Sequence, residues 1–305
     1  MIDLLRAVAL PDDIRAACSS VAARSHRVRA VADAIESYAE SLPAEWPAAP
    51  DPSAGSLEER AAFVLTLNAI NFGSGWFPTL RKPAGMSGFR TIEAGLRAHG
   101  PWDAEALTAI TREEIAAALG QDPGHELIGL FAIHLRELGG RVRDDHGGSF
   151  LALARSGEGS AVALAERLAR FPTWRDVSPY GALEVPFFKR AQIVASDLAA
   201  AGIAPADDLA ELTMFADNLV PHVLRLDGVL TFDNDLVARI ERGELIEHDS
   251  PEEVEIRACA VHAVELLVAA HGSTTAAAVD NALWQRGGKP RYKAAPRHRT
   301  RTTAY

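Results

Sequence analysis

The sequence predicts an all-α, mainly helical protein. Alanine and leucine are abundant among its 305 residues, and runs of alternating β-branched residues are scarce. In the first half of the chain, a serine or threonine followed three residues later by a glutamate precedes an apolar run at Ser56–Glu59 and at Thr111–Glu114, which is the pattern of a helix N-terminal cap. Because alanine and unbranched side chains lose the least conformational freedom on entering a helix, these observations favour helices over strands.

The first half of the chain is predicted to form several helices, two of which begin at these caps. The two capping-box patterns are Ser56–Glu59 and Thr111–Glu114. The proline-rich stretch 43–55 predicts a loop before the first of them. The predicted helical segments of this half are one or two within 12–42, then 61–70, 91–99, 103–109, 111–119, 125–139 and 160–171.

The second half continues the helical pattern. A helix over 187–201 is predicted to end at Gly202, because glycine suits the left-handed position after a helix. A helix over 207–226 is expected to be interrupted at Pro221, since proline cannot donate to the carbonyl four residues back. The remaining predicted elements are helices over 234–242 and 251–271 and one short strand over 229–232.

The charge is unevenly distributed. The net charge is −10, from 41 acidic and 31 basic residues. Duplex binding draws much of its affinity from neutralising phosphates, so this balance argues against a general DNA binder. The segment 286–305, however, holds seven Lys or Arg residues, one His and no acid. Such a tail could hold a phosphate through the donor fork of arginine, or it could be an ordinary solvated terminus.

The sequence lacks the motifs of several classes of protein. Cys18 and Cys259 belong to no CxxC pair, so neither a disulfide framework nor a zinc site is predicted. The ten histidines form no HxxxH or HExxH pattern, and no GxGxxG loop or GxSxG elbow is present. The start of the chain does not read as a signal peptide, and no stretch of about 18 apolar residues suggests a membrane span. We therefore expect a cytoplasmic protein.

Asp217 is a carboxylate in an otherwise apolar segment. Thr213 and Met214 lie one helical turn before it, and Val220 and Pro221 lie one turn after it. Burial of an unpaired charge is costly, so such a carboxylate should find a partner or be retained for a task. The proline predicts a bend beside Asp217 that frees backbone polar groups. Both a structural ion pair and a catalytic role are consistent with this pattern.

Three further features carry candidate chemistry. Lys189 follows two phenylalanines and precedes an apolar helix. Asn71 and the aromatic residues near it suit a flat heterocycle, which stacks on rings and bonds to amides, although such aromatics also fill ordinary cores. Glu253 and Arg257 have the i,i+4 spacing of a common helix salt bridge, which favours a structural interpretation.

Together these segments resemble the queuosine salvage family, the queuosine 5′-phosphate N-glycosylase/hydrolases. Each matching piece is short, but six occur in order from about Asn68 to the C-terminus. They are Asn71-Phe72-Gly73 with Trp76 and Phe77, then 188–193, 213–217, 253–258 with 264–266, 280–284 and 298–301.

The resemblance implies a fold similar to helix-hairpin-helix DNA glycosylases. It also implies one domain over 1–305, with an N-terminal helical part of about 1–150 and a catalytic helical part of about 151–305. Members release queuine, a 7-deazaguanine base, from queuosine 5′-monophosphate, and no metal or other cofactor is expected. The partners expected are therefore this nucleotide and the queuine product, without stable nucleic-acid binding or a membrane.

Carried over to this sequence, the resemblance makes Asp217 and Lys189 the catalytic residues. Phe72 and its neighbours would contact the base, while Lys189 and the C-terminal arginines would hold the 5′-phosphate. The residues expected to bind substrate are Asn71, Phe72, Trp76, Phe77, Glu255, Arg257, His298, Arg299 and Arg301.

The chemistry of such an enzyme agrees with a buried carboxylate. Cleavage of a ribosyl C–N bond passes through an oxocarbenium-like state, which an anion stabilises. Two alternatives stay open. One is a base-excision glycosylase acting on DNA or RNA, which would need a basic face. The other is a non-enzymatic helical scaffold whose basic tail docks an acidic partner or RNA.

Overall fold

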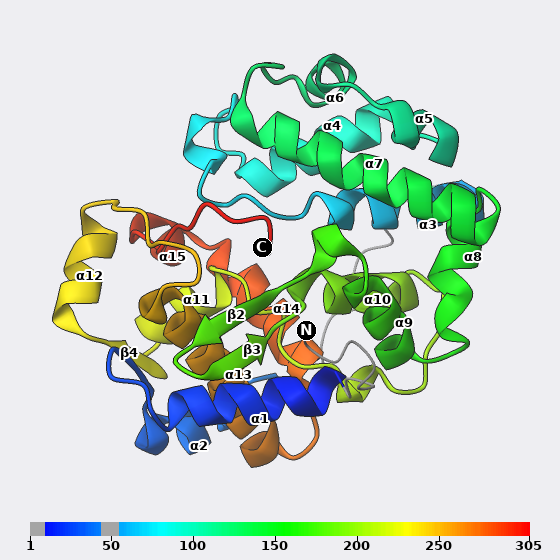
Figure 1. Cartoon of the computed structure of the whole chain (residues 1–305). Coiled ribbons are helices and arrows are strands. Elements are labelled where there is room, and N and C mark those ends of the chain that lie inside the picture. Colours follow the sequence, from blue (N-terminus) through cyan, green and yellow to red (C-terminus); the bar gives the residue numbers. More distant parts are fainter. Residues whose placement is uncertain (1–9, 44–54) are drawn as a thin grey trace. The chain divides into compact units, whose positions relative to one another are not determined.

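A computed structural model of the chain describes residues 10–43 and 55–305. Helices dominate these residues, and the strands described form two short antiparallel pairs (Figure 1). The prediction of a mainly helical protein is therefore confirmed, whereas the likeness to helix-hairpin-helix glycosylases stays a prediction. Most of the proline-rich stretch 43–55 lies outside the described residues.

The chain folds into two compact units, each assembled from three stretches of sequence. The described residues of the first unit are 10–43, 176–188 and 208–298, and those of the second are 55–175, 189–207 and 299–305. Each unit thus depends on contacts between segments that are far apart in the chain. The single domain expected over 1–305 stays a prediction.

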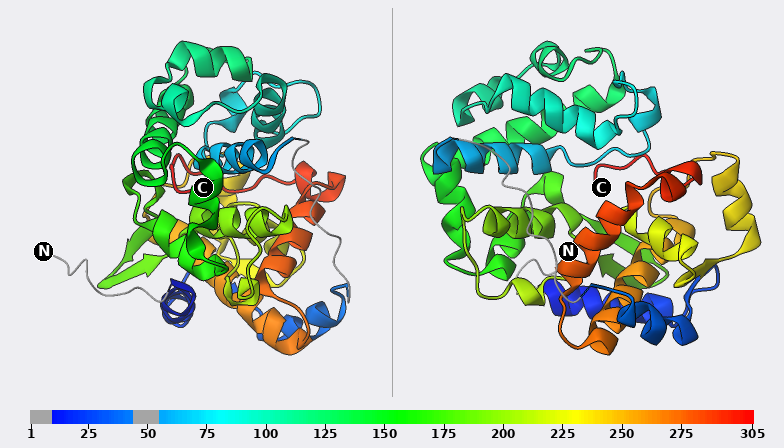
Figure 2. Two further views of the ribbon diagram at one scale, coloured as in Figure 1. Left: turned by 90° about the vertical axis from the view of Figure 1, so that its right-hand side faces the viewer. Right: turned by 180° about the vertical axis from the view of Figure 1, so that it is seen from behind.

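The first unit is organised around the helix α13 (Pro251–His271), which is buried on most of its surface. Ser250 caps its start by accepting from the N–H of Glu253, and Gly272, with φ of 74°, ends it. The other helices are α1 Leu10–Ala22, α2 Ala32–Glu40, α11 Val220–Leu226, α12 Asn234–Glu241, α14 Ala276–Gly287, α15 Pro290–Ala294 and the short 3-10 helix η4 Leu209–Glu211. Helices α1, α2, α11 and α14 all pack on α13 (Figure 2).

Two strand pairs complete the first unit. Strand β1 (Val28–Ala30) pairs antiparallel with β4 (Leu230–Phe232), and β2 (Val177–Tyr180) pairs with β3 (Leu183–Pro186) as a hairpin. The sequence predicted β4 within 229–232 and missed the other three strands. Each is three or four residues long, too short for alternation to stand out from the surrounding helical pattern.

The second unit contains α7 (Glu126–His146), which packs against four other helices of the unit and one 3-10 turn. The remaining helices are α3 Leu57–Ala69, α4 Gly88–His99, α5 Ala104–Ala109, α6 Arg112–Leu119, α8 Phe150–Ala154, α9 Ala161–Ala169 and α10 Lys189–Ala200, with 3-10 turns η1 Phe77–Thr79, η2 Arg155–Gly157 and η3 Pro172–Trp174. Both predicted capping boxes are present, at the starts of α3 and α6. Helix α10 packs on α3 and α9.

One predicted helix is wrong. The segment 212–219 is irregular, and α11 begins only at Val220, with Pro221 in its first turn. Proline removes a hydrogen bond inside a helix but none in the first turn, where the N–H has no helical acceptor. Pro221 therefore starts a helix instead of bending one. Within the described ranges, no helix combines the length and apolar character needed to cross a bilayer.

Candidate active site

The structure places four of the predicted site residues in the first unit and seven in the second. Those in the first unit are Asp217, Glu255, Arg257 and His298, and those in the second are Asn71, Phe72, Trp76, Phe77, Lys189, Arg299 and Arg301.

Asp217 lies in the irregular segment before α11, and its side chain is half-buried. One carboxylate oxygen, Oδ1, accepts the N–H of Leu219 at 2.8 Å and that of Val220 at 3.0 Å. Within the described part of the chain, Oδ2 accepts no hydrogen bond. The carboxylate is therefore held by one oxygen at the start of a helix while the other oxygen can serve a ligand.

Arg257, on α13, fixes the backbone next to Asp217. Its side chain is fully buried, and Nε donates to the carbonyl oxygen of Ala216 at 3.0 Å. Its two terminal nitrogens donate to the two carboxylate oxygens of Asp176 at 2.9 and 2.8 Å. Such bidentate pairs are strong and geometrically specific. The predicted helix pair with Glu253 also forms, at a longer 3.6 Å.

Asp176 is a residue that sequence reasoning missed. It lies directly before β2, and its carbonyl oxygen accepts the N–H of Phe187 at 2.9 Å. The Phe187 ring in turn lies 3.9 Å from the guanidinium carbon of Arg257. No periodic signal marks Asp176, because it lies in a loop and its partner is 81 residues away.

Glu255 is tied to the framework of the first unit. It accepts the N–H groups of Arg27 at 2.8 Å and Val28 at 3.2 Å, together with the hydroxyl of Ser25. Its other oxygen accepts the Tyr180 hydroxyl at 2.8 Å. Burial and this bond raise the pKa of Tyr180 to about 12. These contacts join α13 to β1 and β2, so they support a structural role for Glu255, and its role in substrate binding stays a prediction.

His298 is buried next to the Asp217 segment. Its carbonyl oxygen accepts from the side-chain amide of Asn218 at 3.2 Å. Burial, with the nearby positive charge of Arg297, lowers the pKa of His298 to about 3. The imidazole is therefore neutral near pH 7. It can offer a hydrogen bond to a ligand but no charge to a phosphate.

In the second unit, Lys189 and Arg190 reach the end of α3. Lys189 is 5% exposed, and its Nζ donates to the carbonyl oxygen of Asn71 at 3.0 Å. Arg190 donates to the carbonyl oxygen of Ala69 at 2.7 Å. Carbonyls at the C-terminal end of a helix lack helical donors and carry partial negative charge, so two cations suit them. The structure thus brings together Lys189 and Asn71, which were predicted separately.

The side chain of Asn71 belongs to a buried polar chain. Its Nδ2 donates to Oδ1 of Asn68 at 3.0 Å, and Nδ2 of Asn68 donates to Oδ2 of Asp197 at 2.9 Å. Burial raises the pKa of Asp197 to about 6, against the lowering effects of the Asn68 hydrogen bond and the Lys189 charge. Sequence reasoning missed Asp197, although a carboxylate on the predicted helix 187–201 is a signal of the kind that singled out Asp217.

Phe72 is a core residue. It is 1% exposed, and its ring packs edge-on against Phe131 and beside His134, with centroids 5.2 and 4.4 Å apart. The guanidinium of Arg190 lies 5.2 Å from the same ring. Burial, with Arg190 adding to it, lowers the pKa of His134 to about 2. This packing supports the alternative that Phe72 fills the core, and its contact with the base stays a prediction.

Trp76 and Arg301 lie close together. The indole Nε1 of Trp76 donates to Glu126 at 2.7 Å, and Arg301 forms an ion pair with the same carboxylate at 3.5 Å. The guanidinium of Arg301 lies 5.7 Å from the Trp76 ring. Phe77 is half-buried in η1. Arg301 is exposed, so its pair with Glu126 can give way to a stronger anion.

The C-terminal segment 299–305 is packed, not a loose tail. The N–H of Gly73 donates to the carbonyl oxygen of Tyr305 at 2.9 Å, and Thr300 is fully buried. A Cβ atom on Gly75 would lie 2.5 Å from the Thr300 carbonyl oxygen, so this close approach needs glycine. Arg299 is half-buried and, among the described residues, has no hydrogen-bond or ion-pair partner. Its guanidinium can therefore bind an anion.

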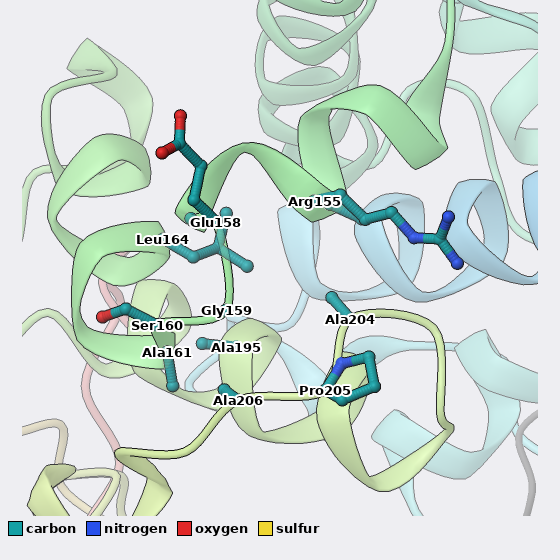
Figure 3. A pocket seen from close by; sticks show the side chains of 12 residues that line it. Arg155, Glu158, Gly159, Ser160, Ala161, Leu164, Ala195, Ala204, Pro205 and Ala206 are labelled. Atoms are coloured by element: carbon teal, nitrogen blue, oxygen red, sulfur yellow. The ribbon is translucent and has the colours of Figure 1, made fainter.

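Two other features contain none of the residues predicted to form the site. A cavity of about 300 Å³ in the second unit is lined mainly by small residues of 154–161 and 204–206 and by none of the predicted ones (Figure 3).

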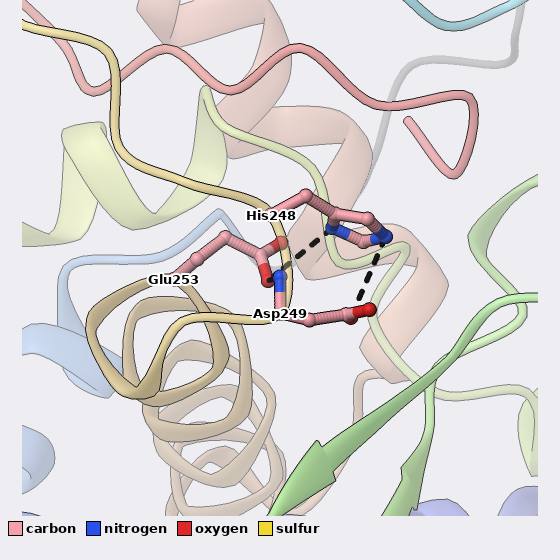
Figure 4. A group of neighbouring side chains, drawn as sticks. All are labelled: His248, Asp249 and Glu253. Atoms are coloured by element: carbon pink, nitrogen blue, oxygen red, sulfur yellow. Dashed lines mark hydrogen bonds and ion pairs between the residues drawn. The ribbon is translucent and has the colours of Figure 1, made fainter.

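In the first unit, His248 lies 3.5 Å from Asp249 and 3.6 Å from Glu253 (Figure 4). Histidine, aspartate and glutamate are residue types that bind metal ions. However, the guanidinium of Arg257 lies 3.6 Å from the Glu253 carboxylate, and its positive charge disfavours a cation there.

Comparisons with known proteins point to one family. A family model described as queuosine salvage protein matches residues 51–305. A protein of Sphaerobacter thermophilus named queuosine 5′-phosphate N-glycosylase/hydrolase is 38% identical over 266 residues, which are 81% of this chain and 82% of the relative. A Dictyostelium discoideum protein of the same name is 34% identical over 67% of this chain and 66% of its own length.

Proposed function

This chain belongs to the queuosine salvage protein family, and we propose that it hydrolyses the N-glycosidic bond of queuosine 5′-phosphate to release queuine. The observation that carries the proposal is the match to that family over residues 51–305, with relatives named for this activity. Its substrate would be a free nucleotide in the cytoplasm. The net charge of −10 supports a nucleotide over a nucleic acid, which would have to approach an acidic surface.

We propose Asp217 as the catalytic carboxylate. Positive charge develops on the ribose as the C–N bond breaks, and a fixed anion beside it stabilises the transition state more than the ground state. The two N–H groups that hold Oδ1 fix the carboxylate in place. Oδ2 can then face the sugar or accept a proton from the attacking water. Arg257 supports this geometry through the carbonyl of Ala216.

The leaving base sets a second requirement. A 7-deaza base has carbon where a purine has N7, so protonation at that position is not open to the enzyme. Hydrogen bonds to other edges of the base must stabilise it instead. Asn71 is the candidate donor for this role, because its Nδ2 gives one N–H to Asn68 and its half-exposed side chain has a second N–H for the departing base.

Lys189 and Arg299 are the candidates to hold the 5′-phosphate. Lys189 provides a buried ammonium, and Arg299 provides a guanidinium with no partner among the described residues. Binding energy from a phosphate remote from the reacting bond helps to orient the sugar. Arg301 is a weaker candidate, because Glu126 already neutralises it.

The test is a substrate comparison. The purified chain is incubated with queuosine 5′-monophosphate, with queuosine nucleoside and with an RNA oligomer that contains queuosine, and free queuine is followed by chromatography. We expect the fastest release from the nucleotide. Absence of release from all three substrates would refute an N-glycosylase, and faster release from the oligomer would favour a nucleic-acid glycosylase.

A further inference from the structure

A continuous polar chain in the second unit links Lys189 to a carboxylate two turns along the same helix. Lys189 is the first residue of α10 and Asp197 lies near its end, while Asn68 and Asn71 belong to α3 and the residues just after it. The three hydrogen bonds of the chain are 3.0, 3.0 and 2.9 Å long. The contact therefore runs from the Lys189 ammonium through both asparagines to the Asp197 carboxylate.

Each asparagine is bound so that its orientation is fixed. Nδ2 of Asn68 donates both to Asp197 and to the carbonyl oxygen of Val64 at 3.2 Å, which leaves Oδ1 to accept from Asn71. Asn68 is 1% exposed, so water does not compete for these bonds. Because buried polar groups must be satisfied, loss of one member would disturb the others.

The negative charge of Asp197 can offset the buried positive charge of Lys189. An ammonium that is 5% exposed is costly to bury, and a nearby anion reduces that cost. The positive charge of Lys189 lowers the pKa of Asp197, whereas the negative charge of Glu93 on α4 raises it. Burial outweighs both and places that pKa at about 6, so Asp197 is mostly ionised at pH 7.5.

We propose that Asp197, acting through Asn68 and Asn71, is a positioning residue that holds the side chains of Lys189 and Asn71 in place for the nucleotide. This inference rests on the proposed function, since it takes Lys189 to serve the substrate. Asp197 itself need not touch the substrate. A site whose supporting side chains are locked in this way keeps the precision that catalysis needs.

The test is a double-mutant cycle with Lys189→Met and Asp197→Asn. Asparagine keeps an acceptor for Asn68 but removes the charge. We expect Asp197→Asn to lower kcat/KM for the nucleotide about tenfold in the wild-type background and less than about twofold in the Lys189→Met background. Equal effects in the two backgrounds would show that Asp197 does not act through Lys189, and would overturn the proposal.

Glu58→Gln is the matched control. Glu58 is a half-buried carboxylate on α3 that accepts from the N–H groups of Phe150 and Leu151, away from the polar chain. Its loss should affect stability and leave nucleotide kinetics within about twofold. In contrast, Asp197→Asn should be at least as stable as the wild type at pH 7.5, because a raised pKa means that the fold favours the neutral form.

A readout without turnover separates this inference from the proposed function. The chain has four lysines, and Lys82, Lys289 and Lys293 are exposed. Acetylation by a lysine-selective ester, followed by mass spectrometry, should be at least about threefold faster at Lys189 in Asp197→Asn than in the wild type, with the exposed lysines as internal references. Equal labelling of Lys189 in the two proteins would overturn the positioning role even if no substrate is turned over. Faster labelling in Asp197→Asn, combined with a wild type that releases no queuine, would count only against the proposed function.

Discussion

The guanidinium of Arg257 donates to the carbonyl oxygen of Ala216 across 3.0 Å, one residue before Asp217. The same guanidinium is paired with Asp176, so a buried ion pair and the backbone of the candidate catalytic residue are coupled. The position of the Asp217 carboxylate thus depends on α13, which is distant in sequence. This relationship and the other charged or titratable side chains described above lead to four predictions.

Replacing Arg257 by lysine should destabilise the protein. A lysine cannot make the bidentate contact with Asp176 together with the bond to Ala216, so buried acceptors lose their donors. We expect the free energy of unfolding to fall by about 2–4 kcal/mol in urea titrations. Arg239→Lys, at a partly exposed pair with Glu252, should change it by less than about 1 kcal/mol. Similar losses in both variants would contradict the assigned role of Arg257.

Asp217→Asn should abolish most turnover without unfolding the protein. Asparagine can still accept the two N–H groups at the start of α11, but it carries no charge for the oxocarbenium-like state. We expect kcat for queuine release to fall by roughly 10²–10³-fold, while nucleotide binding measured by calorimetry is retained.

Asp233→Asn is the control for this substitution. Asp233 likewise accepts a backbone N–H at a helix start, that of Leu236 at the start of α12, and lies in the same unit. Its asparagine variant should keep wild-type turnover. Full activity of a folded Asp217→Asn protein would remove Asp217 from the mechanism.

Arg299→Ala should weaken recognition of the phosphate. A guanidinium without a protein partner breaks no protein contact when an anion binds, and truncation removes its attraction for the phosphate. We expect KM for the 5′-nucleotide to rise about tenfold and KM for the nucleoside to change less than twofold. Arg301→Ala should have a smaller effect, because Glu126 already pairs with Arg301. Equal changes for nucleotide and nucleoside would exclude Arg299 from the phosphate site.

The protein should lose stability as the pH falls below about 6.5. Burial lowers the pKa of His134 to about 2, that of His298 to about 3 and that of His222 to about 4. The unfolded chain protonates these histidines near pH 6.5, so it binds more protons than the folded chain below that pH. Asp197 and His248, whose pKa values are raised, act in the opposite direction and offset part of this effect. The net difference is about two protons, so the free energy of unfolding should fall by roughly 3 kcal/mol per pH unit.

Urea midpoints at pH 7.5, 6.0 and 5.0 measure this dependence. His298→Gln should reduce the slope by about one proton, because one of the three buried imidazoles is gone. His99→Gln changes an exposed histidine and should leave the slope as it is. A slope that His298→Gln does not alter would contradict the neutral, buried state assigned to His298.

Local sequence patterns predicted much of the helical framework. Both capping boxes, the helix over 251–271 and the mainly helical class are confirmed, because caps and periodicity act within one or two turns. The half-burial of Asp217 also followed from its apolar neighbours. The helix expected around it did not form, since Pro221 satisfied the requirements of a helix start.

The sequence by itself therefore determined most of the segments that become helices, the family and which polar residues stand out among apolar ones. Only the tertiary structure decided which partners those residues have. Asp176 reaches Arg257 across 81 residues, and Asn68 reaches Asp197 across 129. Periodicity carries no information at such separations. A buried carboxylate accepts hydrogen bonds from the donors that lie next to it after the helices have packed, so its partners are decided by tertiary packing.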